Sequence, residues 1–153
     1  MPKTVLVAGA TGLVGYACLK HFANQPGCEV IALSRRRPDQ TFGARWYPLD
    51  LADGAACAAL APQLAGVTHL VYAALYERPG LVAGWREDEQ IALNEAMLKN
   101  LFEPLEQAAP GLRHAARAAR IVERGLAGAL HEGGIDAERG DHVHRAADRI
   151  AHD

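Results

Sequence analysis

Hydrophobic residues occur in short continuous runs that alternate with stretches of helical periodicity. Four runs predict buried strands, at residues 4–8, 29–34, 44–51 and 67–74. The spacing of apolar residues predicts helices over residues 12–24, 53–64 and 82–108. Continuously apolar strands that alternate with helices indicate a parallel sheet covered on both faces. Right-handed crossovers then give the strand order 3-2-1-4, the N-terminal part of a doubly wound, Rossmann-like α/β fold.

Helix faces and boundaries follow from the same pattern. The apolar face of the first helix is predicted to carry Val14, Ala17, Cys18, His21 and Phe22. That of the 82–108 helix is predicted to carry Ile91, Met97, Leu98, Leu101 and Leu105. Asp53 is placed to cap the 53–64 helix, and Pro104 lies inside the last predicted helix.

Composition is that of a globular domain of 153 residues, half hydrophobic and 22% charged. The net charge of −2 argues against a nucleic-acid partner, and no apolar run approaches the roughly 18 residues of a membrane helix. The first residues lack the features of a signal peptide. Three cysteines without metal-ligand spacing are expected to be reduced thiols, which is typical of a cytoplasmic protein.

A glycine loop follows the first predicted strand, in the sequence Gly9-Ala10-Thr11-Gly12-Leu13-Val14-Gly15. Glycine permits a tight turn and lets the backbone approach a pyrophosphate. The helix that follows would present unpaired N–H groups to this anion. The position of the loop between a strand and an amphipathic helix supports a dinucleotide-binding site rather than a loop that needs glycine only for packing.

Ser34, Arg35 and Arg36 stand at the end of the second predicted strand. A site that prefers NAD would place an acidic residue there to bind the ribose 2′-hydroxyl. A hydroxyl and two guanidinium groups suit a 2′-phosphate instead, which indicates NADP (NADPH) as the cofactor. The alternative is a solvated basic turn.

Two further strand ends face the same expected crevice. Asp50 could accept a hydrogen bond from the adenine amino group with Leu51 against the ring, or it could simply cap a turn. Ala73 and Ala74 are small enough to leave room for the nicotinamide, although alanine is also common in buried strands.

The segment Thr-Val-Leu-Val-Ala-Gly-Ala-Thr-Gly-Leu-Val-Gly resembles the opening of the extended short-chain dehydrogenase/reductases, the NAD(P)-dependent epimerase/dehydratase group. The stretch from Asn94 to Leu101 is similar to a helix of that family. Ser34-Arg35-Arg36, Asp50-Leu51 and the residues after Ala73 look closest to the progesterone 5β-reductase/iridoid synthase-like branch. The resemblance covers residues 3–113 and implies NADPH-dependent reduction of an enone or a related carbonyl-containing small molecule.

The family pattern does not continue beyond residue 113. Family members have a fifth strand there and a Tyr-x-x-x-Lys or related pair, in which the lysine lowers the pKa of the phenol. This chain has no tyrosine after Tyr76 and no lysine after Lys99, so no catalytic residue is assigned. Tyr16 and Lys20 match the spacing, but they lie on the first helix, where a solvated pair is expected.

Residues 114–153 differ in composition from the rest. They contain no Pro, Phe, Trp, Tyr or Lys, but ten Ala, six Arg and five of the seven His. We therefore divide the chain into an incomplete NADP-binding domain, residues 1–113, and a tail expected to be helical or partly disordered, with helices near 115–131 and 143–150. His142 and His144 are expected to be surface residues rather than metal ligands.

Several explanations of this tail and of the function stay open. The tail could come from a truncated or frame-shifted reductase gene, or its helices could cover the bare edge of the fourth strand. The chain itself could be an oxidoreductase, a non-catalytic NADP-binding module or an inactive fragment. The 82–108 helix is the expected face of a homodimer.

Overall fold

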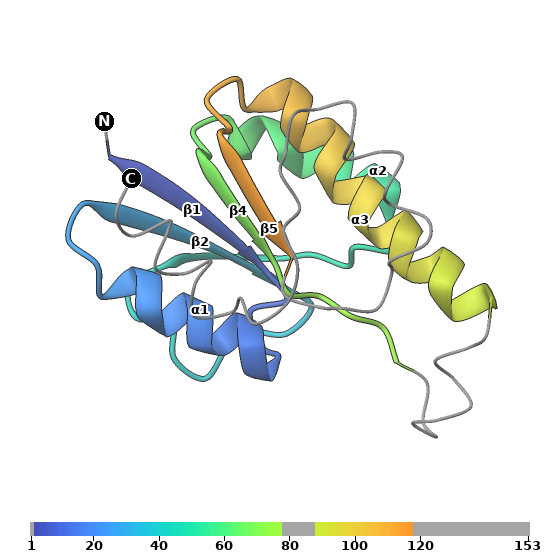
Figure 1. The fold of residues 1–153 in the computed structure, drawn as a ribbon, viewed down its shortest axis with the longest axis horizontal. Helices are drawn as coiled ribbons and strands as arrows, with labels where there is room; N and C mark the ends of the chain where they lie inside the picture. Colours follow the sequence, from blue (N-terminus) through green and yellow to red (C-terminus); the bar gives the residue numbers. More distant parts are fainter. Residues whose placement is uncertain (1, 78–87, 118–153) are drawn as a thin grey trace.

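A computed structural model describes residues 2–77 and 88–117 (Figure 1). The strands are β1 (Lys3–Ala8), β2 (Cys28–Ser34), β3 (Arg45–Pro48), β4 (His69–Tyr72) and β5 (His114–Arg117). The helices are α1 (Leu13–Ala23), α2 (Gly54–Leu60), the 3₁₀ turn η1 (Ala61–Leu64) and α3 (Asp88–Ala108). The predicted strands and helices up to residue 108 are thus confirmed within the described residues, with bounds that differ by a few positions.

The five strands form one parallel sheet in the order β3-β2-β1-β4-β5. The predicted order 3-2-1-4 is confirmed, and β5 extends it. β1 lies at the centre, with Val5 opposite both Val30 of β2 and His69 of β4. The chain therefore adds β2 and β3 on one side of β1 and then β4 and β5 on the other side, so the strand order reverses between β1 and β4, as in doubly wound folds.

Side chains that alternate along the strands make two hydrophobic layers, one on each face of the sheet. Val5 and Val7 pack with Phe22 of α1, whereas Leu6 packs with Leu101 and Leu105 of α3. In Figure 1, α1 covers one face of the sheet, and α2 and α3 cover the other. Both faces of the central strand are fully buried, which explains its continuous apolar sequence.

The helix predicted from residue 115 is wrong in its first residues, because His114–Arg117 form β5. Alanine and arginine favour helix over strand, so local propensity misleads here. The edge of β4 decides the outcome, because Ala115 and Ala116 pair with Leu70 and Val71. A strand rather than a tail helix therefore covers the edge of β4, where the predicted four-stranded sheet ended.

Two predicted helix faces are shifted. On α1 the buried residues are Gly15, Cys18, Leu19 and Phe22, whereas Ala17 is exposed. On α3, Leu98, Leu101 and Leu105 are buried as expected, but Ile91 and Met97 are only half-buried. Gln90 and Asn94 take the buried positions in the first turns of α3. The predicted 53–64 helix ends in a 3₁₀ turn, with Pro62 near its start.

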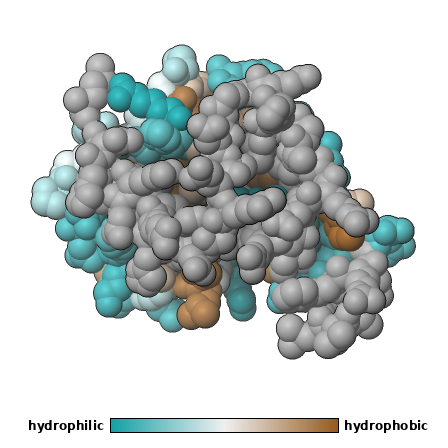
Figure 2. Space-filling model, in the orientation of Figure 1, coloured by the Kyte–Doolittle hydropathy of each residue, from teal (hydrophilic) through white to brown (hydrophobic). Residues whose placement is uncertain are grey.

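The predicted start of the last helix at residues 82–87, the tail helices and the His142/His144 pair lie outside the described residues. Within the described part of the chain, no helix combines the length and hydropathy that spanning a membrane requires. Figure 2 shows a described surface that is mainly hydrophilic in this view, with small separate hydrophobic patches. All three cysteines are unpaired thiols.

Candidate functional site

The loops after β1, β2 and β4 are tied together at the carboxyl edge of the sheet. The backbone N–H groups of Gly9 and Ala10 both donate to the carbonyl of Leu33, at 2.9 and 3.1 Å. The N–H of Ala73 donates to the carbonyl of Ala8 at 2.8 Å. The glycine loop therefore lies between the ends of its two neighbouring strands, at the point where the strand order reverses, where α/β sheets bind ligands.

The three glycines of the loop meet different surroundings. Gly9 has φ +84°, and a Cβ there would lie 2.6 Å from the amide nitrogen of Ala74. A Cβ at Gly15 would lie 2.1 Å from the carbonyl oxygen of Gly9. A Cβ at Gly12 would meet no atom of the described residues closer than that same oxygen at 3.5 Å, an ordinary contact. The fold itself thus requires glycine at positions 9 and 15, whereas the open space beside Gly12 is available to a ligand.

The N-terminus of α1 opens towards this space. Gly12 has an extended backbone (φ −75°, ψ 163°), and no side chain caps the helix. Its carbonyl accepts the first helical hydrogen bond, from the N–H of Tyr16 at 2.8 Å. The first turn carries no acidic residue. Uncapped N–H groups and the positive end of the helix dipole make this turn suitable for an anion.

The side chains of the loop differ in exposure. Thr11 is exposed, and Val14 is half-buried against the layer beneath α1. Leu13 is 91% exposed, the one large hydrophobic side chain of the described residues left in solvent to this degree. Thr11 and Leu13 are therefore available to a molecule bound at the loop.

Ser34, the last residue of β2, is buried, whereas Arg35 and Arg36 are exposed. The Ser34 hydroxyl donates to the carbonyl of Arg36 at 2.6 Å and accepts from the Trp46 indole N–H at 3.0 Å. The hydroxyl predicted to bind a ligand thus has two protein partners. Among the described residues, no acidic side chain pairs with Arg35 or Arg36.

The loop after β3 forms a turn around Asp50. One carboxylate oxygen of Asp50 accepts from the N–H of Ala52 at 3.0 Å, and the Asp50 carbonyl accepts from the N–H of Asp53. The exposed carboxylate therefore has a structural bond, which fits the turn hypothesis, and a second oxygen outside it. The side chain of Leu51 is only 6% exposed and belongs to the core beneath α3.

Two asparagines of α3, given no role in the sequence analysis, hold loops at this edge. The Asn94 amide accepts from the N–H of Tyr76 at 2.8 Å and donates to its carbonyl at 2.9 Å. It therefore braces the segment that contains the half-buried Ala73 and Ala74. Asn100 donates to the carbonyl of Leu51 at 2.9 Å. Asn94 is buried and Asn100 is half-buried, and the signal in the sequence was the family-like stretch that contains both residues.

Neither Cys57 nor Tyr72 is set up as a reactive group. Burial, followed by the charges of Asp53 and Asp50, raises the pKa of the Cys57 thiol to about 11. Burial also raises the pKa of the Tyr72 phenol, and its hydroxyl has no hydrogen-bond partner in the described structure. Both groups stay protonated near neutral pH, so neither acts as a thiolate or a phenolate.

The Tyr-x-x-x-Lys match on α1 gains no catalytic geometry. The Tyr16 ring packs against Phe42, with ring centroids 5.6 Å apart, while Lys20 is exposed. The tyrosine is thus a packing residue rather than half of a solvated pair.

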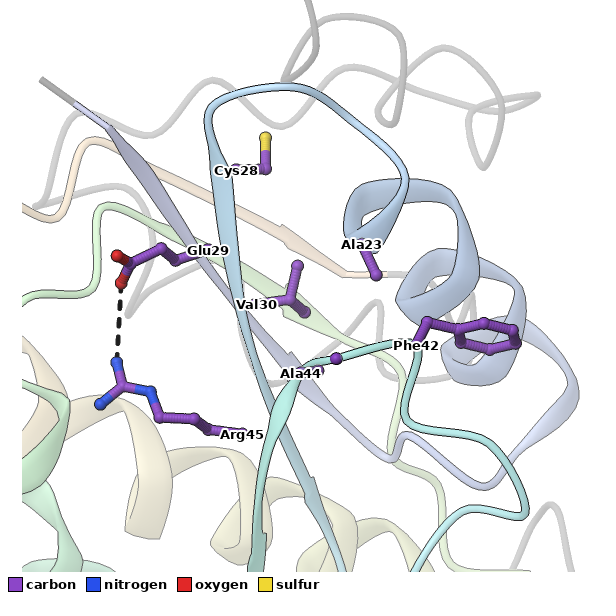
Figure 3. A pocket seen from close by; sticks show the side chains of 8 residues that line it. Ala23, Cys28, Glu29, Val30, Phe42, Ala44 and Arg45 are labelled. Carbon is purple, nitrogen blue, oxygen red and sulfur yellow. Dashed lines mark ion pairs between the residues drawn. The ribbon is translucent and has the colours of Figure 1, made fainter.

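A separate hollow of about 420 Å³ lies at the other end of β2, between the end of α1 and the segment before β3 (Figure 3). Its walls include Ala23, Val30 and Phe42. Figure 3 shows the Glu29–Arg45 ion pair on the opposite side of β2 from Phe42. The hollow is therefore remote from the glycine loop, and the two charged residues among those that line it, Glu29 and Arg45, form an ion pair with each other.

Comparison with solved structures shows the same fold in oxidoreductases. A Burkholderia multivorans protein described as a short-chain dehydrogenase/reductase, with bound NADP, has a TM-score of 0.60 at 19% identity, over 99% of this chain and 69% of its own. A Leptospira borgpetersenii short-chain dehydrogenase with bound NAD⁺ has 0.51 at 20%, over 71% and 44%. Uronate dehydrogenase from Agrobacterium tumefaciens has 0.53 at 26%, over 73% and 39%.

This chain thus spans 39% to 69% of the length of these three proteins. None of the curated proteins matches its sequence. The model of the NAD dependent epimerase/dehydratase family matches residues 5–118, which include the whole sheet from Val5 to β5 and every loop of the crevice. The chain belongs to the NAD dependent epimerase/dehydratase family.

Proposed function

We propose that the crevice binds NADP(H), with the pyrophosphate on the N-terminus of α1. The open space beside Gly12, next to uncapped N–H groups, carries this proposal. Leu13 and Thr11 would flank the pyrophosphate, and Val14 would support the turn from beneath. Ala73 and Ala74 lie on the β4 side of the loop, where they would leave room for the nicotinamide.

The end of β2 supports NADP rather than NAD. Arg35 and Arg36 follow the buried Ser34, and no acidic residue stands at this strand end. Two guanidinium groups that have no acidic partner among the described residues favour a phosphate over a neutral hydroxyl. Asp50 would face the adenine end, where its second carboxylate oxygen is available to the amino group, and Leu51 would contribute its backbone rather than its buried side chain.

The proposed activity is that of an extended short-chain dehydrogenase/reductase that reduces an enone or a related carbonyl-containing small molecule in the cytoplasm, as in the progesterone 5β-reductase/iridoid synthase-like branch. Bound NADPH would supply the hydride, while the chain binds the dinucleotide and orients it. A non-catalytic NADP-binding module is the second candidate. It is favoured by the surroundings of two tyrosines of the described chain, because the Tyr16 ring packs against Phe42 and the Tyr72 hydroxyl is buried.

Calorimetric titration of the chain with NADP⁺ and with NAD⁺ tests the cofactor. We expect NADP⁺ to bind more tightly, and Arg35→Ala to weaken NADP⁺ by about tenfold with less effect on NAD⁺, because one charge-assisted bond is lost. Arg113→Ala, on an exposed residue before β5, is the matched control. Absence of binding of either dinucleotide would refute the proposal.

Oxidation of NADPH in the presence of a panel of enones separates the two candidate functions. Steady turnover by the purified chain supports the oxidoreductase, and binding without turnover supports the module. A homodimer through α3 is a further part of the proposal. It predicts a concentration-dependent mass in light scattering, and a monomer at all concentrations would contradict it.

A further inference from the structure

Trp46 lies beside the arginine turn but is not part of it. It is on β3, opposite Ala32 of β2, and its half-buried ring packs on the α1 side of the sheet. Its indole N–H crosses to the neighbouring strand and donates to the Ser34 hydroxyl at 3.0 Å. This bond connects an aromatic ring of the sheet with the last residue of β2.

The Ser34 hydroxyl also makes a hydrogen bond to the arginine turn. A hydroxyl has one proton, and here it is given to the carbonyl of Arg36 at 2.6 Å. Trp46, Ser34 and Arg36 therefore form a directional chain of two hydrogen bonds, and each bond polarises the next. The N–H of Leu49 also donates to the carbonyl of Ser34, at 3.1 Å, which fixes the backbone at the same point.

The ring of Trp46 makes a second contact with the turn. The guanidinium carbon of Arg37 lies 6.0 Å from the ring centroid, at the outer limit of a cation–π contact. Pro38, the next residue, is buried. Both ends of the Arg35-Arg36 segment are thus fixed to the protein, at Ser34 and at Arg37-Pro38, while the two side chains between them stay exposed.

We infer that Trp46 is a positioning residue that sets the preference for a 2′-phosphate by holding the arginine turn through Ser34. This inference rests on the proposed NADP site and adds a specificity determinant from another strand. Without the indole N–H, the Ser34 hydroxyl can rotate, and the peptide after Arg36 loses its fixed orientation. The turn that carries Arg35 and Arg36 must then be ordered when a phosphate binds, and this entropy cost lowers the affinity.

The test compares dissociation constants of the full chain for NADP⁺, NAD⁺ and 2′,5′-ADP. Trp46→Phe keeps an aromatic ring and removes the N–H. We expect NADP⁺ and 2′,5′-ADP to bind about five- to tenfold more weakly, the effect of one hydrogen bond, with NAD⁺ unchanged. Tyr47→Phe is the matched control, because it removes a polar hydrogen from the next aromatic residue of β3, which packs on the other face.

Ser34→Ala tests the connection itself. We expect it to weaken 2′,5′-ADP binding to a similar extent, and the double variant with Trp46→Phe to add less than twofold, because both changes break one chain of bonds. Preserved NADP⁺ preference in Trp46→Phe, or equal loss of NAD⁺ and NADP⁺ affinity, would overturn the inference. Failure of the unmodified chain to bind any dinucleotide would instead refute the proposed function, and the inference with it.

Discussion

The three glycines of the loop allow stability to be separated from binding by one small substitution. Gly12→Ala adds a methyl group where the nearest heavy atom is 3.5 Å away, on a backbone conformation that alanine adopts freely. Gly15→Ala adds the same group 2.1 Å from the Gly9 carbonyl oxygen and 2.7 Å from its carbon. The atoms that the new methyl group of Gly15→Ala would meet belong to the backbone, so they cannot rotate away as a side chain could.

The expected magnitudes follow from these contacts. Relief of the Gly15→Ala overlap requires α1 to move by roughly 1 Å from the loop, since nonbonded carbon contacts lie near 3.5 Å. Overpacking of this kind costs about 3 kcal/mol of unfolding free energy. Gly12→Ala is expected to change it by less than about 1 kcal/mol, because the lower chain entropy of the unfolded state offsets the slightly poorer helix cap.

Gly12→Ala is expected to weaken dinucleotide binding although it hardly changes the stability of the fold. The methyl group of Gly12→Ala would occupy the space into which a pyrophosphate must come, so the helix N–H groups would lose charge-assisted bonds and affinity would fall by at least about tenfold. Urea denaturation measures the stability of both variants, and titration with NADP⁺ measures affinity. A Gly12→Ala variant that keeps both its stability and its full affinity would refute the placement of the pyrophosphate beside Gly12.

Other predictions concern groups that support the site. Asp53→Ala should lower the unfolding free energy in urea denaturation by about 1 kcal/mol, since Asp53 accepts the Ala56 N–H at the start of α2; Asp53→Asn should not. Asn94→Ala should cost about 3 kcal/mol, because it leaves the Tyr76 backbone groups unpaired in a mostly buried site; a loss below about 1 kcal/mol would refute this bracing role. The pKa of the Cys57 thiol is about 11 in the folded protein, above the ordinary 9.0. The protonated thiol therefore contributes fully to the free energy of unfolding below pH 9, and this contribution is lost as the pH rises towards 11. Cys57→Ala should therefore show a shallower alkaline decline in stability, and an equal decline would contradict burial as the cause.

The sequence predicted the central part of the fold because the strands there are buried on both faces. Val5, Leu6 and Val7 are fully buried, and any other arrangement would expose them. The glycine loop was predicted for a similar reason, since Gly9 and Gly15 are required by backbone contacts that only a strand-loop-helix turn creates. Local sequence and tertiary structure agree at these positions.

The prediction failed where the secondary structure or the role of a residue depends on a neighbour that is distant in sequence. Ala115 and Ala116 have the composition of a helix, yet β4 makes them a strand. Trp46 carries no motif, and its role depends on the parallel register that puts it beside β2. The buried amide of Asn94 faces a loop 18 residues earlier. A periodicity analysis sees none of these partners, because each contact exists only after the sheet has formed.

The same dependence explains why the site and the core are difficult to alter separately. Gly9 gives its N–H to the end of β2, and its Cα lies so close to Ala73 and Ala74 that no side chain fits between them. Substitution of Gly9 therefore disturbs two strand connections as well as the ligand surface. At Gly12, a Cβ would make only an ordinary contact with the described residues, so a requirement for glycine there would come from what binds. Affinity measured at Gly12 is consequently the most direct measure of whether the crevice holds a dinucleotide.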